Sequence, residues 1–137
     1  MTQGLGIRGV HHIGVVVEDI DAAVSHHLAT MGGEVIHRET LPDRGVEAAA
    51  VKTGASEVEY IAPLSSDSSI GRFLASRGPG MHHVAWAVPD LTASLVAARE
   101  AGIRIIDPEP RIGLHGTPVA FLHPAGMNGV LTELVQE

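Results

Sequence analysis

The chain has 137 residues, of which 45% are apolar and 18% are charged, a length that suits one compact domain with a substantial core. Its formal net charge of −7 argues against nucleic acid or an anionic membrane surface as the main partner. The absence of cysteine excludes disulfides, thiolate metal ligands and cysteine nucleophiles. Because there is no signal-peptide run at the start and no apolar stretch near about 20 residues, we expect a cytoplasmic protein.

The first half of the chain is predicted to fold as β-α-β-β-β. An apolar strand, residues 12–17, runs into Asp19, which is suited to cap a helix, and Gly32-Gly33 is suited to end that helix. A short strand over residues 34–38 follows. Residues 46–53 and 57–62 then alternate as a hairpin around a turn at Gly54.

The second half repeats this pattern after a linker, residues 65–80, that is rich in Ser and Gly and has a short helix predicted at 70–76. The segment from His12 aligns without gaps on the segment from His83 (83 − 12 = 71), with Asp90 as the cap and Gly102 at the helix end. Strands are predicted at 103–107, 118–123 and 130–136. Chance similarity is the alternative, but the shared order of elements favours duplication within one domain, 1–137, with modules at about 9–64 and 81–137.

Four polar residues at matched places in the two halves predict a metal site. Strand alternation places His12 and His83 on faces that carry small neighbours, which leaves room for a ligand. Glu133 is flanked on its face by aliphatic residues, and a buried carboxylate is costly without a cation or hydrogen bonds. Alone, each histidine could be structural and Glu59 could be a solvated edge residue. Together they predict one divalent metal, of a kind that accepts nitrogen and oxygen ligands, bound by His12, Glu59, His83 and Glu133.

The remaining histidines carry weaker signals. His26, His27 and His37 are predicted to lie on the surface. His115 and His123 lie near a glycine-rich loop in a position to touch a substrate.

Several stretches resemble the vicinal oxygen chelate superfamily and, within it, the methylmalonyl-CoA epimerase family. The resemblance covers about Gly9 to Glu137, and its clearest segments are HHIGV at 11–15, EVIHRE at 34–39, APLSSDS at 62–68, GMHHVA at 80–85, RIGLHG at 111–116, VAFLHP at 119–124 and GVLTEL at 129–134. It implies an α+β fold in which two βαβββ modules, related by pseudo-two-fold symmetry, form a curved mixed sheet around the metal site.

The resemblance also implies the chemistry. The expected metal is Co²⁺, with Mn²⁺, Zn²⁺ or Ni²⁺ as alternatives. It would act as a Lewis acid while a proton moves at the α-carbon of (2R)/(2S)-methylmalonyl-CoA through an enolate. Glu133 would be both a metal ligand and a base. Some members carry a second catalytic glutamate at a position that is Ala48 here, and Glu47 could replace it only if the strand were bulged. A metal-bound or ordered water is the alternative acid for that side of the α-carbon. An acyl-CoA substrate and a homodimer are expected.

Substrate contacts are expected from the loop at 111–118. Its glycines allow close backbone approach, and Arg111 is suited to pair with the carboxylate or the CoA arm, although a plain surface arginine is the alternative. His115 and Gly116 complete the expected substrate-binding set.

Other functions of the same fold remain open at this point. These are an epimerase for another acyl-CoA, a glyoxalase-type lyase, and a metal-free module that binds a small molecule. An extradiol-type dioxygenase needs vacant metal positions, and the apparent fourth ligand Glu59 argues against it.

Overall fold

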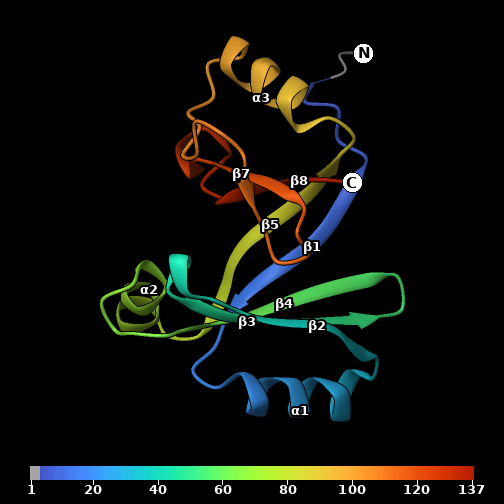
Figure 1. Ribbon diagram of the computed structural model, residues 1–137, viewed down its shortest axis with the longest axis vertical. Coiled ribbons are helices and arrows are strands. Elements are labelled where there is room, and N and C mark those ends of the chain that lie inside the picture. Colours follow the sequence, from blue (N-terminus) through green and yellow to red (C-terminus); the bar gives the residue numbers. More distant parts are fainter. Residues whose placement is uncertain (1–3) are drawn as a thin grey trace. The chain divides into compact units, whose positions relative to one another are not determined.

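The computed structural model describes residues 4–137, so residues 1–3 of the predicted domain lie outside it. Its order of strands and helices is β-α-β-β-β, then a helix, then β-α-β-β-β, which confirms the predicted repeat (Figure 1). The elements are β1 (Gly9–Val16), α1 (Ile20–Met31), β2 (Glu34–Leu41), β3 (Val46–Thr53), β4 (Ser56–Pro63), α2 (Ser69–Arg77), β5 (Gly80–Val88), α3 (Leu91–Glu100), β6 (Arg111–Ile112), β7 (Pro118–Leu122) and β8 (Thr132–Gln136).

By its internal contacts the chain divides into two compact units. One comprises His12–His82, and the other comprises His83–Glu137 together with residues 4–11. The strand β1 is therefore shared, since its first three residues cluster with the second unit. Among the described residues, no helix is both long enough and apolar enough to cross a membrane.

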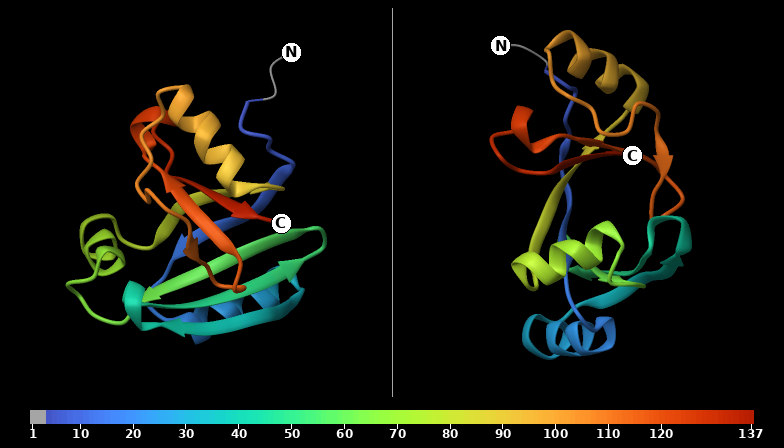
Figure 2. Two further views of the ribbon diagram at one scale, coloured as in Figure 1. Left: turned by 45° about the horizontal axis from the view of Figure 1, so that its top comes forward. Right: turned by 90° about the vertical axis from the view of Figure 1, so that its left-hand side faces the viewer.

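In the unit His12–His82 the strands lie in the order β2-β3-β4-β1, with β4 and β1 parallel and the other neighbours antiparallel. Helix α1 covers one face of these strands (Figures 1 and 2). It begins where Asp19 Oδ1 accepts a hydrogen bond from the Ala22 amide at 3.1 Å, as predicted. Ile20 packs there against Ala49 and Ala62. Helix α2 packs on the opposite face through Ile70.

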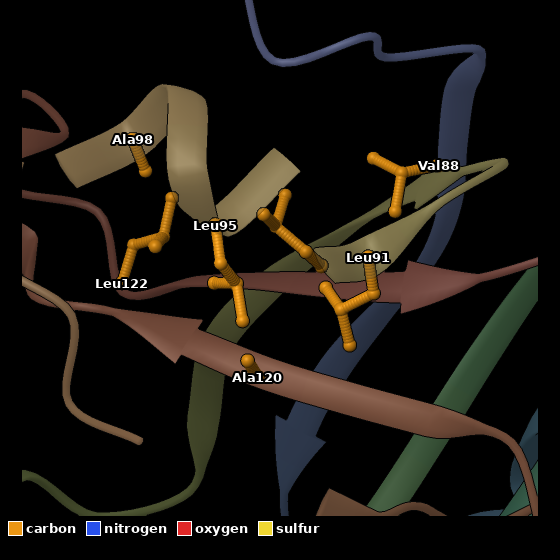
Figure 3. Packing of buried hydrophobic residues seen from close by; sticks show 7 residues of the cluster. Val88, Leu91, Leu95, Ala98, Ala120 and Leu122 are labelled. Atoms are coloured by element: carbon orange, nitrogen blue, oxygen red, sulfur yellow. The ribbon is translucent and has the colours of Figure 1, made fainter. Parts of the chain in front are cut away.

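In the unit that contains His83–Glu137 the strands lie in the order β5-β8-β7-β6, with β5 and β8 parallel. Asp90 caps α3 through the Ala93 amide at 3.1 Å. The helix then packs aliphatic side chains onto one face of the sheet (Figure 3). The core of this unit contains Val88, Leu91, Leu95, Ala98, Ala120, Leu122 and Leu134.

The predicted strand at 103–107 is wrong. Only an isolated bridge, Ile105 to Leu122, forms there. The side chain of Asp107 then takes the place of a backbone acceptor, because its Oδ2 accepts the Phe121 amide at 2.9 Å. Pro108 follows and has no amide hydrogen to continue a ladder. The edge strand of this unit is instead the two-residue β6.

Strand β2 contains a bulge that matters for the site. Val35 pairs with Val51 and His37 pairs with Ala50, so Ile36 is an extra residue in β2. A residue inserted in this way shifts every later side chain of the strand to the other face. The β3–β4 ladder runs from Val46 to Thr53 without such a shift.

Candidate metal centre

In the unit His12–His82 a histidine and a glutamate meet on the face opposite α1. The parallel β1–β4 register pairs Gly14 with Glu59, which places Glu59 on the same face as His12, two residues earlier in β1. His12 Nε2 lies 3.5 Å from Glu59 Oε2. The His12 side chain is 4% exposed and that of Glu59 is 13% exposed, so both are largely removed from water.

The other unit contains the equivalent pair. Here the parallel β5–β8 register pairs Ala85 with Glu133, and His83 lies two residues before Ala85. His83 Nε2 lies 3.3 Å from Glu133 Oε1, and both side chains are buried. The same strands, the same spacing and the same two residue types therefore recur in both units, as the duplication predicts.

The geometry of each pair fits two ligands of one metal ion. Separations of 3.5 and 3.3 Å are longer than the usual charge-assisted hydrogen bond of about 2.7–2.9 Å. Ligand bonds of about 2.1 Å at angles of about 90–109° would place two donor atoms about 3.0–3.4 Å apart. Imidazole nitrogen and carboxylate oxygen suit Co²⁺, Zn²⁺, Mn²⁺ and Ni²⁺. The donor set of each pair is therefore compatible with such an ion.

The neighbours of the two glutamates differ. Glu59 pairs across the ladder with Ala50, whereas Glu133 pairs with Phe121. The Phe121 ring meets His83 edge-on, with ring centroids 5.3 Å apart. A bulky ring thus packs beside one pair and a methyl group lies beside the other.

Glu47, the sequence candidate for a second base, lies on the α1 face. It pairs with Ala62 in the β3–β4 ladder, while Glu59 and its partner Ala50 lie on the opposite face. Its carboxylate is 3.4 Å from Arg38, which also pairs with Asp21 of α1. The bulge that Glu47 would need is in β2 instead of β3, so the structure does not bring Glu47 to the face of the His12–Glu59 pair.

The loop residues expected to contact substrate lie around β6. Arg111 is half-exposed and its guanidinium lies 3.5 Å from the Asp107 carboxylate. His115 is exposed, with its ring 6.2 Å from that of His11. Gly116 has a φ of 74°, a conformation that favours glycine and shapes the turn before β7.

His27 was predicted to lie on the surface, and that prediction is wrong. It is 1% exposed, and its side chain extends from α1 to the sheet. Its Nδ1 lies 2.7 Å from the Tyr60 hydroxyl and its Nε2 lies 2.7 Å from Thr53 Oγ1. The spacing of Ile20, Val24 and His27, at i, i+4 and i+7, is the sequence signal for a buried helix face that could have identified it.

Comparison with known proteins identifies the family of the chain. The family model for the glyoxalase/bleomycin resistance protein/dioxygenase superfamily matches residues 11–121. The mitochondrial methylmalonyl-CoA epimerase of Bos taurus is 39% identical over 93% of this chain and 73% of its own length. The ethylmalonyl-CoA/methylmalonyl-CoA epimerase of Cereibacter sphaeroides is 37% identical over 95% of this chain and 98% of its own.

Among solved structures, a variant of the Streptomyces coelicolor methylmalonyl-CoA epimerase in complex with 2-nitronate-propionyl-CoA matches with a TM-score of 0.91. It is 39% identical, with 96% of this chain and 98% of that chain covered. The fold and the family match thus define a member of the glyoxalase/bleomycin resistance/dioxygenase superfamily. Within that superfamily, the chain belongs to the methylmalonyl-CoA epimerase family. The predicted fold class and family are confirmed.

Proposed function

We propose that this chain interconverts (2R)- and (2S)-methylmalonyl-CoA, and that His12, Glu59, His83 and Glu133 together bind one divalent metal for this reaction. The observation that carries the proposal is the matched His–Glu pair in each unit, with separations of 3.5 and 3.3 Å, in a chain of this family. A metal-free binding module would have no need of two such pairs at equivalent positions.

The substrate explains what the residues must do. The α-carbon of methylmalonyl-CoA lies between a thioester and a carboxylate, so loss of its proton places negative charge on the thioester oxygen. The metal, when bound, supplies a Lewis acid for that charge. Glu133 takes the proton from one side of the α-carbon and later returns it. Its burial keeps bulk water away from the carboxylate, and His83 beside it limits its orientation.

Finer points rest on the resemblance. Co²⁺ is the metal that we expect first, with Mn²⁺, Zn²⁺ or Ni²⁺ as alternatives, and a homodimer in the cytoplasm remains a prediction. A second acyl-CoA substrate is a specific alternative, because the Cereibacter sphaeroides relative is named for both ethylmalonyl-CoA and methylmalonyl-CoA. Arg111, His115 and Gly116 are proposed to contact the substrate's carboxylate or CoA arm, with Arg111 exchanging its Asp107 partner for that anion.

The decisive experiment follows deuterium at the α-carbon. The Co²⁺-loaded protein is mixed separately with (2R)- and (2S)-methylmalonyl-CoA in deuterated water, and both inversion and deuterium uptake are measured. We expect Glu133→Gln to slow inversion of both epimers, and deuterium uptake from the epimer whose proton Glu133 takes, by about 10² to 10⁴, because a positioned proton-transfer group contributes about that factor. We expect His12→Ala to lose bound metal.

Glu100→Gln, an exposed glutamate at the end of α3, is the matched control and should behave as wild type. Uptake at the wild-type rate from both epimers in Glu133→Gln would remove Glu133 from the proposed role. If the wild-type protein neither inverted the substrate nor exchanged its α-proton, the proposed function itself would be wrong.

A further inference from the structure

Inversion of a carbon centre needs a proton-transfer group on each side of it, and Glu133 supplies only one. This requirement follows from stereochemistry and rests on the proposed function. The residues of β3 nearest Glu59 on its face, Ala48 and Ala50, carry no acid, and Glu47 lies on the α1 face. The strand next to β3, β2, is a place from which the second group can come.

Strand β2 supplies a histidine and a glutamate on this face. Because of the bulge at Ile36, His37 pairs with Ala50 and Glu39 pairs with Ala48. Paired residues point to the same side of a sheet, so both side chains share the face of Glu59. Leu41, two residues further on, packs in the core cluster on that face, which confirms the direction of the alternation.

The row of paired residues His37, Ala50 and Glu59 crosses three neighbouring strands. Two strand spacings separate the first from the last by about 9.6 Å between backbones. Ala50 contributes only a methyl group in between. The equivalent position in the other unit, Phe121, carries an aromatic ring. The β3 neighbour of Glu59 is thus small where the β7 neighbour of Glu133 is bulky, and we take the β3 side of Glu59 as the place for the substrate's acyl group.

His37 and Glu39 are also bound to each other. His37 Nε2 lies 3.1 Å from Glu39 Oε2, and because a carboxylate only accepts, the imidazole N–H donates. We propose that Glu39 is the second proton-transfer residue of the epimerase, and that His37 is a positioning residue that holds its carboxylate. Glu39 is directly across the ladder from Ala48, so it presents a carboxylate beside the position where the resemblance would place one.

The protons balance in both directions. For one epimer, Glu133 takes the α-proton and protonated Glu39 gives its own proton to the opposite side of the carbon. For the other epimer the two carboxyl groups exchange roles. The Glu39 side chain is 41% exposed, so its proton can exchange with water between turnovers. Each carboxyl group returns to its starting state when the reverse reaction or solvent exchange follows.

The test separates exchange from inversion. Each methylmalonyl-CoA epimer is incubated in deuterated water with the Co²⁺-loaded full chain, as wild type and as Glu39→Gln. For Glu39→Gln we expect inversion to fall by about 10² or more, while Glu133 still exchanges the α-proton of one epimer with retention of configuration. The other epimer should neither exchange nor invert. His37→Gln should lower the inversion rate by about tenfold, with KM unchanged.

Three further measurements show whether a loss of inversion comes from lost proton transfer instead of lost metal or substrate binding. Metal content and the Kd for 2-nitronate-propionyl-CoA should match wild type in both variants. Glu34→Gln, on the same strand and paired with Lys52, is the control and should leave inversion unchanged. Wild-type inversion by Glu39→Gln, or equal loss of exchange from both epimers, would overturn the assignment of Glu39 while leaving the proposed function intact. A wild-type protein without any exchange would instead overturn the proposed function, and this inference with it.

Discussion

Replacing His27 by phenylalanine tests the buried hydrogen bonds that join α1 to the sheet. Thr53 Oγ1 donates to the Gly32 carbonyl at 2.8 Å, so it must accept from His27 Nε2, and His27 Nδ1 then accepts from the Tyr60 hydroxyl. Phenylalanine keeps a ring in the core but removes both bonds. At about 1–1.5 kcal/mol for each bond, the free energy of unfolding should fall by about 2–3 kcal/mol. For a chain of this size, that loss lowers Tm by roughly 10 °C.

The measurement is urea unfolding followed by far-UV circular dichroism, with the slope m compared between variants. His26→Gln is the matched control, because the neighbouring His26 is exposed and its replacement should change stability by less than about 0.5 kcal/mol. The His27→Phe change should also cost less in a Tyr60→Phe background, since one bond is already missing there. If His27→Phe were no more destabilising than His26→Gln, the inferred hydrogen bonds would be wrong.

Two further predictions concern stability. Burial raises the pKa of the Tyr60 phenol above its usual value of about 10, so the stabilisation that depends on the neutral phenol is complete below pH 10 and is lost as the pH rises through the folded-state pKa. Tyr60 is the single tyrosine, so an absorbance titration should show a native midpoint above 10 that moves down to about 10 in urea; a native midpoint at or below 10 would contradict this. Leu95→Ala should lower the free energy of unfolding by about 2–4 kcal/mol, because Leu95 is 2% exposed in the core beneath α3. Val96→Ala, at a position 46% exposed, should change it by less than about 0.5 kcal/mol, and equal losses would show that Leu95 is not a core residue.

Local patterns in the sequence were sufficient for most of the elements and, together with the internal repeat, for the residues of the two His–Glu pairs. Helix caps act over three residues, so Asp19 and Asp90 could be recognised without a tertiary structure. Strand alternation has a period of two, so it placed His12 and His83 on faces with small neighbours. The internal repeat then linked Glu59 with Glu133, which no single strand could have done.

Register and burial were decided only by the tertiary structure. The bulge at Ile36 turns His37 and Glu39 to the face of Glu59, and its position depends on how β2 pairs with β3, which no short-range pattern specifies. The strand predicted at 103–107 is interrupted because the Asp107 side chain bonds to Phe121, far along the chain. His27 of α1 can be buried because Thr53 of β3 and Tyr60 of β4 supply its hydrogen bonds. Periodicity determines which way a side chain can point, whereas the partners that it meets there depend on segments distant in sequence.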